Sequence, residues 1–187
     1  MGDLNQFLWV KNNRSLIKGP VLEIGSRFYD SQTSINYRSL CEGLSYIGAD
    51  LSDGENVDKV VDFTVSSDKI RQTFKDSFST VICCSVMEHV KDIYSFARNV
   101  SAVMNPGGVL FLSVPFTWEF HGYPNDYWRF TPPAVQFLFP DFDFSGSLNT
   151  ISSSRDGVMM KLENLNDINE FLLKEHLFRR YESSNNG

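Results

Sequence analysis

Residues 80–115 read TVICCSVMEHVKDIYSFARNVSAVMNPGGVLFLSVP. Two short apolar runs, 80–84 and 109–114, are typical of buried strands. Between them apolar side chains recur every three to four positions, which predicts a long helix that stops at the Asn-Pro-Gly-Gly turn of residues 105–108. A strand, a helix and a second strand in this order predict two parallel strands of one sheet.

The same alternation extends to both sides of this unit. Three strands are predicted upstream, at 21–25, 46–51 and 57–61, and helical segments at 4–19, 30–43, 70–74 and 132–139. Downstream, Asp156-Gly157 between two strand-like runs predicts a hairpin over 147–163, followed by a helix over 168–181. The fold class is therefore α/β: a Rossmann-like doubly wound sheet, mostly parallel, of about seven strands, with a C-terminal antiparallel hairpin and helices on both faces.

The domain organisation follows from this pattern. We expect an N-terminal helical arm over 1–19, a single domain over 20–182 and a flexible tail over 183–187. A chain of 187 residues with 42% hydrophobic and 21% charged residues has the size and composition of one globular domain.

Charge and cysteine content limit the classes of partner. Seventeen basic against 23 acidic residues give a net charge of −6, which argues against a nucleic acid or an anionic membrane as the main partner. The three cysteines suit buried thiols in a reducing compartment, and no metal-ligand spacing occurs, so no metal is expected. The N-terminus does not resemble a secretory signal, and no apolar run approaches the length of a membrane span. These features predict a cytoplasmic protein and leave its oligomeric state open.

Polar residues stand where the predicted strands end, which is where parallel sheets bind ligands. Gly25 closes the first strand and lets backbone approach a ligand, and Asp50 ends the second strand with a carboxylate that suits a ribose diol. Together they predict a nucleoside site. An ordinary turn and a solvated acid are the alternatives.

The next two strands end in further candidates. Asp62 and Phe63 suit the amino group and the face of an adenine, although Asp62 also suits a helix cap. Ser85 and Glu88 have the spacing of a capping box, which is the favoured interpretation of the pair. His89 is either a packed, hydrogen-bonded side chain or a ligand contact.

Four segments, 21–25, 46–52, 81–90 and 105–115, resemble the ordered motifs of class I S-adenosylmethionine-dependent methyltransferases, and the resemblance spans residues 21–163. HGYPNDYWRFTP, at residues 121–132, further resembles a bacterial subgroup with an H-x-x-P-x-D-Y-W-R-F-T loop.

The resemblance implies S-adenosylmethionine as the cofactor, and its implied contacts are as follows. Glu23, Gly25 and Ser26 would meet the methionine end, Asp50 the ribose, Leu51, Asp62 and Phe63 the adenine, and Ser85 would line the floor. One departure stands out, because Arg27 follows Ser26 where the family usually has further glycines. Either this turn is built differently or cofactor binding is weaker.

The loop over 116–130 carries seven aromatic residues among its fifteen. A structural plug is one interpretation, with Trp128 and Phe130 packed inward and an internal ion pair between Asp126 and Arg129. For His121 and Tyr123 an acceptor pocket is favoured. The acceptor contacts predicted from this loop and its surroundings are His89, His121, Tyr123, Tyr127 and Arg129.

Methyl transfer is an in-line displacement, so the protein mainly aligns the acceptor and excludes water. A small-molecule acceptor, such as a sugar or another metabolite, is expected. If it is a hydroxyl or an amine, His121 is the predicted base because histidine titrates near neutrality, and Asp126 either orients it or is the base. A carboxylate acceptor needs no base.

Two other functions remain open. An NAD(P)-dependent oxidoreductase also uses a glycine turn and an acid at the second strand end, although the full G-x-G-x-x-G pattern is absent. The altered turn at Arg27 is compatible with a methyltransferase-like domain that binds the cofactor without catalysis.

Overall fold

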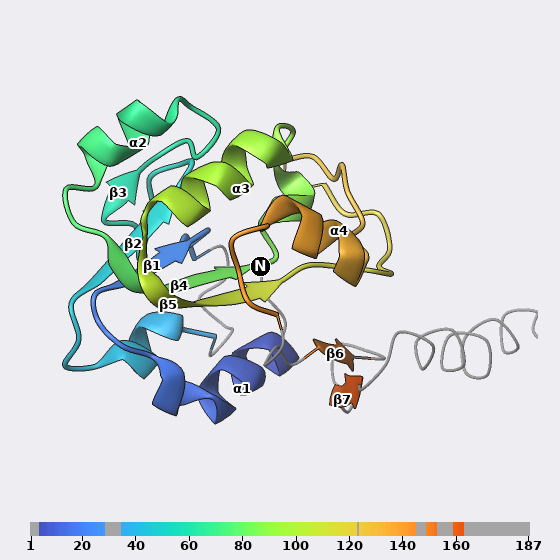
Figure 1. Cartoon of the computed structure of the whole chain (residues 1–187). Helices are drawn as coiled ribbons and strands as arrows, with labels where there is room; N and C mark the ends of the chain where they lie inside the picture. Colours follow the sequence, from blue (N-terminus) through green and yellow to red (C-terminus); the bar gives the residue numbers. More distant parts are fainter. Residues whose placement is uncertain (1–3, 29–34, 123, 145–148, 153–158, 163–187) are drawn as a thin grey trace, which may run out of the picture. The chain divides into compact units, whose positions relative to one another are not determined.

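The computed structural model describes residues 4–28, 35–122, 124–144, 149–152 and 159–162. The chain divides into two units, residues 1–142 and 143–187, and each is described by itself. The first unit contains a parallel sheet and the helices that cover it (Figure 1).

Five strands form that sheet: β1 (Val21–Ile24), β2 (Tyr46–Asp50), β3 (Lys59–Val60), β4 (Phe78–Cys84) and β5 (Met104–Ser113). Their order is β3-β2-β1-β4-β5, and every neighbouring pair is parallel. Because the chain moves from β1 to one side and then returns to β4 on the other, the strand order reverses between β1 and β4. This is the point at which doubly wound sheets bind ligands.

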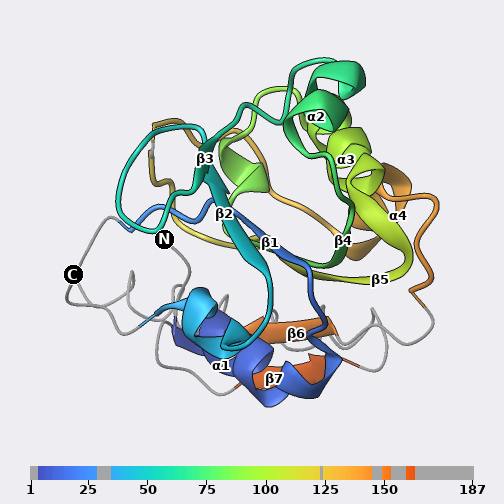
Figure 2. The ribbon, with the colours of Figure 1, turned by 90° about the vertical axis from the view of Figure 1, so that its left-hand side faces the viewer.

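Helices cover both faces of the sheet (Figures 1 and 2). One face carries α1 (Leu4–Asn12) and the 3₁₀ turn η2 (Tyr37–Cys41), with a second 3₁₀ turn, η1 (Arg14–Leu16), after α1. The other face carries α2 (Ser67–Thr73), α3 (Ile93–Ala102) and α4 (Pro132–Leu138). The predicted fold class, a Rossmann-like α/β sheet with helices on both faces, is confirmed.

The core is apolar on both faces. Val10 of α1 is fully buried with Val21 and Ile82, and the rings of Trp9 and Phe111 meet at 5.4 Å. The N-terminal helix is therefore packed on the sheet. Within the described residues, every helix is too short or too polar to traverse a bilayer.

The longest predicted helix is interrupted. A 3₁₀ turn, η3 (Met87–His89), precedes α3, which begins only after Asp92. The Asp92 carboxylate accepts a hydrogen bond from the Ser95 amide at 3.0 Å and so caps α3. This local hydrogen bond competes with the backbone hydrogen bonds of a helix that would continue through residues 90–92. The capping box of Ser85 and Glu88 is therefore wrong. Residues 105–108, expected as a turn, lie within β5.

The second unit contains the predicted hairpin strands. β6 (Asn149–Ser152) and β7 (Met159–Leu162) pair antiparallel and form a two-stranded sheet of their own. In the described part of the chain the main sheet thus has five strands, fewer than the seven expected. The turn at 155–157, the helix over 168–181 and the tail over 183–187 lie outside the described residues.

Candidate active site

Gly25 brings the end of β1 against the segment after β4. Its φ is +80°, and a Cβ atom there would lie 2.4 Å from Cγ2 of Val86. Both the backbone conformation and the contact exclude a larger side chain. The Val86 side chain, just after β4, therefore lies against the backbone of Gly25, just after β1, at a separation that only glycine allows.

Asp50 presents a fixed, buried carboxylate at the end of β2. The side chain's Oδ2 accepts a hydrogen bond from the Arg27 amide at 3.2 Å, and Oδ1 accepts one from the Ser52 amide at 3.0 Å. A carboxylate oxygen can accept two hydrogen bonds, so each oxygen keeps capacity for a ligand hydroxyl. This donor and acceptor chemistry suits a ribose diol.

Ser26 is tied to the loop after β2. Its hydroxyl donates to the carbonyl of Asn56 at 3.1 Å, and its own carbonyl accepts from the Asn56 side chain at 2.9 Å. Ser26 is 1% exposed, so its hydroxyl is committed inside the protein. The turn after β1 is built on this pairing, in place of the further glycines that the resemblance implies.

Glu23 lies buried in the middle of the sheet, on β1, and accepts a hydrogen bond from the hydroxyl of Tyr46 on β2. Burial raises the pKa of Glu23 from 4.5 to about 8, although the Tyr46 hydroxyl and the nearby Arg38 partly oppose this. Glu23 is thus a neutral acid at neutral pH.

The proton on Glu23 makes stability depend on pH. The unfolded chain loses this proton above about pH 4.5 and the folded protein only near pH 8, so stability falls as the pH rises between these values. We expect Glu23→Gln to lack this loss, so that the stability of the variant relative to the wild type increases across that window. Urea unfolding at several pH values measures it. Glu55→Gln, an exposed control, should follow the wild type, and parallel curves for Glu23→Gln would contradict a buried neutral Glu23.

The residues predicted to read the adenine are not equivalent. Leu51, beside Asp50, exposes 62% of its surface. Asp62 accepts hydrogen bonds from the amide and hydroxyl of Thr64, at 2.8 and 2.6 Å. Phe63 is 4% exposed, and its ring packs at 5.8 Å from Phe74 and 5.9 Å from that of Phe96. Phe63 therefore belongs to the core beneath α2 and α3.

Ser85 directly follows β4 and has an uncommon backbone conformation, with φ of 55°. Its amide donates to the carbonyl of Ser113, and its hydroxyl is paired with the side-chain amide of Gln6, at 2.8 and 3.2 Å. Helix α1 therefore reaches the reversal point through Gln6. The sequence contains no signal for this contact, because it joins segments far apart in the chain.

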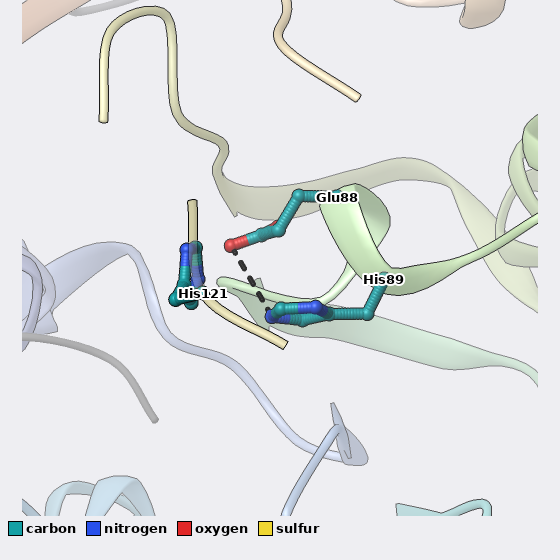
Figure 3. A group of neighbouring side chains, drawn as sticks. All are labelled: Glu88, His89 and His121. Atoms are coloured by element: carbon teal, nitrogen blue, oxygen red, sulfur yellow. Dashed lines mark ion pairs between the residues drawn. The ribbon is translucent and has the colours of Figure 1, made fainter. Parts of the chain in front are cut away.

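Glu88, His89 and His121 form a compact polar cluster just beyond β4, which we call the Glu-His-His cluster (Figure 3). Oε1 of Glu88 lies 3.9 Å from Nε2 of His89, and the two imidazole rings meet edge to face at 5.0 Å. Burial raises the pKa of Glu88 to about 7, whereas burial and the nearby His121 lower the pKa of His89. Sequence reasoning missed Glu88, whose spacing from Ser85 indicated a cap.

Asp126 lies beside the Nδ1 atom of His121, and Arg129 holds Asp126 in place. The Arg129 guanidinium binds both oxygens of Asp126, at 2.5 and 2.7 Å. Asp126 in turn accepts from the backbone amide of His121 at 2.9 Å and lies 3.2 Å from its Nδ1. Above all the Arg129 hydrogen bonds hold the pKa of Asp126 well below its usual range. Asp126 is thus a weak proton acceptor, and its geometry suits orientation of His121.

Some side chains of the aromatic loop over 116–130 are buried, and others are exposed. Phe130 is 4% exposed, and the indole of Trp128 donates to the carbonyl of Val90 at 2.8 Å. The backbone of Tyr127 donates to the carbonyl of Glu88 at 2.7 Å, while its side chain is exposed. These bonds attach the loop to the segment after β4. Tyr123 lies outside the described residues.

Comparison with known proteins gives the family. A family model described as a methyltransferase domain matches residues 15–144. The chain therefore belongs to this family of methyltransferase domains. No curated protein sequence matches it.

Two solved structures are similar to this chain. A trans-methyltransferase, CalH, in complex with SAH shares 18% identity, with a TM-score of 0.35, over 72% of this chain and 38% of that one. The selenomethionine form of phosphoethanolamine N-methyltransferase 2 from Haemonchus contortus, in complex with S-adenosyl-L-methionine, shares 14% identity, with a TM-score of 0.46, over 96% of this chain and 43% of that one. The chain thus spans about two fifths of the length of each.

Proposed function

We propose that this protein transfers a methyl group from S-adenosylmethionine to a small-molecule acceptor, such as a sugar or another metabolite. The observation that carries the proposal is the approach of Gly25 to Val86 beside the Asp50 carboxylate, in a chain of the methyltransferase domain family. The Glu-His-His cluster follows the end of β4, at the same reversal point.

The side chains at this edge fit such a cofactor. Asp50 keeps hydrogen-bonding capacity for a ribose diol, and Leu51 offers exposed apolar surface to a base. When bound, S-adenosylmethionine supplies a methyl group that the positive charge on its sulfur has already activated. The remaining proposed contacts are Glu23, Gly25 and Ser26 for the methionine end, Asp62 for the adenine, and Ser85 for the floor.

The chain itself must hold the acceptor and remove its proton. For a hydroxyl or amine acceptor, His121 is the proposed base that takes up this proton. The Nδ1 atom of His121 faces the Asp126 carboxylate, which leaves Nε2 as the basic nitrogen. His89, Tyr123 and Tyr127 are the proposed acceptor contacts.

Arg129 is assigned a different part in the same loop. Its guanidinium is bound to Asp126 and to the carbonyls of Trp118 and Glu119, so it acts through Asp126 as a positioning residue.

The bacterial subgroup with the H-x-x-P-x-D-Y-W-R-F-T loop is the proposed placement within the family. The free, buried cysteines support a reducing compartment such as the cytoplasm.

Asp50→Ala should weaken the binding of S-adenosylmethionine. Loss of the carboxylate leaves ligand hydroxyls without an acceptor, which costs about 1–3 kcal/mol, or roughly 5- to 150-fold in Kd. Calorimetry measures the change. Asp53→Ala, in the exposed loop that follows, is the matched control and should bind like the wild type. Unchanged binding by Asp50→Ala would remove Asp50 from the site.

The same calorimetry tests the alternatives. Binding of S-adenosylmethionine and S-adenosylhomocysteine but not NADH is expected, and the reverse would overturn the proposal in favour of an oxidoreductase, which the family does not favour. Release of S-adenosylhomocysteine with a library of acceptors then separates an active enzyme from a domain that only binds the cofactor.

A further inference from the structure

We propose that Glu88, His89 and His121 bind a divalent transition-metal cation at the acceptor end of the site. One donor atom from each residue lies within 4.8 Å of the other two. The inference departs from the expectation that no metal is bound. Cation binding stands on this geometry alone, and only its use in activating an acceptor rests on the proposed function.

The tautomer of His89 is set for coordination. Its Nδ1 atom lies 2.6 Å from the carbonyl oxygen of Asn125. A carbonyl only accepts hydrogen bonds, so Nδ1 carries the proton and Nε2 keeps its lone pair. Nε2 is also the atom that faces Glu88 (Figure 3). In metal-binding histidines, the ring nitrogen that does not bind the metal usually donates a hydrogen bond to a backbone carbonyl, a carboxylate or water.

His121 has the same arrangement with a stronger partner. Its Nδ1 atom lies 3.2 Å from Oδ2 of Asp126 and 3.1 Å from the carbonyl of Glu119, and both are acceptors. The Nε2 lone pair is therefore available. A carboxylate behind the ring orients a metal-binding histidine and makes it a better ligand. Arg129 holds that carboxylate in place with two hydrogen bonds.

Glu88 supplies an independent observation. The residue is 1% exposed, and its Oε2 atom has no hydrogen-bond partner among the described residues. A buried carboxylate oxygen without a partner is costly. Oε1 of the same carboxylate faces His89, so a cation that is bound by both carboxylate oxygens and the two imidazoles removes this cost.

The donor set selects the cation. Two imidazole nitrogens and one carboxylate suit Zn²⁺, Co²⁺ or Fe²⁺, whereas Mg²⁺ and Ca²⁺ prefer oxygen ligands. Bonds of about 2.0–2.2 Å place neighbouring ligand atoms roughly 3.0–3.4 Å apart, so the 3.9 Å between Glu88 and His89, and the separations of up to 4.8 Å within the cluster, must shorten on binding.

Three protein ligands leave coordination positions open. An acceptor hydroxyl bound at one of them loses its proton more readily, because the cation stabilises the negative oxygen. In the metal-loaded protein, Nε2 of His121 is a ligand, and the acceptor proton passes to water instead of to this ring. This changes the role of His121 from a base to a ligand while leaving it essential.

The test is a Co²⁺ titration of the purified full-length protein after treatment with a chelator, followed by calorimetry and by visible absorption. We expect one Co²⁺ per chain, a visible band on binding, and displacement by Zn²⁺. His89→Ala, His121→Ala and Glu88→Gln should each weaken binding at least about tenfold, and Asp126→Asn by about 10- to 100-fold. Glu55→Gln, at an exposed position, is the matched control for Glu88→Gln and should bind like the wild type.

The proposal is overturned if no saturable binding occurs, or if Glu55→Gln weakens it as much as Glu88→Gln does. Glu88→Gln preserves side-chain size and supplies the result if a histidine variant does not fold, as judged by circular dichroism. Calorimetry with S-adenosylmethionine separates the two proposals. Cobalt binding without cofactor binding overturns methyl transfer alone, and cofactor binding without cobalt binding overturns the metal site alone.

Discussion

Replacing His121 with alanine is expected to lower kcat by about 10²- to 10⁴-fold, the usual contribution of a positioned proton acceptor. The Kd for S-adenosylmethionine should not change, because His121 lies on the loop after β5 and Asp50, the proposed ribose contact, lies at the end of β2. Release of S-adenosylhomocysteine at saturating acceptor measures kcat, and calorimetry measures the Kd.

The His121 experiment has two controls. Arg98→Ala, at an exposed position on α3, should leave both quantities unchanged. An equal loss of turnover and cofactor affinity in His121→Ala would mean that the loop is structural. Treatment of the wild type with a chelator distinguishes His121 as a base from His121 as a metal ligand. Only if His121 binds a metal does the chelated wild type become as slow as the variant.

Arg129→Ala is expected to give the largest loss of stability, about 1–3 kcal/mol, because it leaves the buried Asp126 side chain without its partner although solvent reaches Arg129 itself. Asp126 has only 1% of its side chain exposed and would keep its charge without a counter-ion. The carbonyls of Trp118 and Glu119 would also lose their donor. Urea unfolding measures the change.

Three further variants show where this stability originates. Arg129→Lys should also be destabilised, because a lysine cannot bind both carboxylate oxygens and two carbonyls at once. Asp126→Asn combined with Arg129→Ala should lose less than Arg129→Ala alone, because no charge is orphaned. Arg98→Ala, at an exposed position on α3, should change little. A loss below about 1 kcal/mol for Arg129→Ala would indicate an ordinary surface pair.

Local patterns predicted the sheet well because short apolar runs that end in glycine or an acid have few alternative structures. The runs at 80–84 and 109–114 became parts of β4 and β5. The helix between them was predicted too long, since its apolar period continues through a break that the Asp92 cap creates. Phe63, predicted at the adenine, lies in the core, because the same apolar ring suits either place until the packing partners are known.

Local sequence was enough to predict the α/β alternation, the glycine after β1 and the acid that ends β2, because each depends on neighbours within a few residues. It could not predict that His121 lies beside Glu88 and His89, that Arg129 binds Asp126 next to His121, or that Gln6 contacts Ser85. These contacts join segments far apart in the chain. Their partners are chosen by the path of the backbone over the sheet, on which local periodicity carries no information.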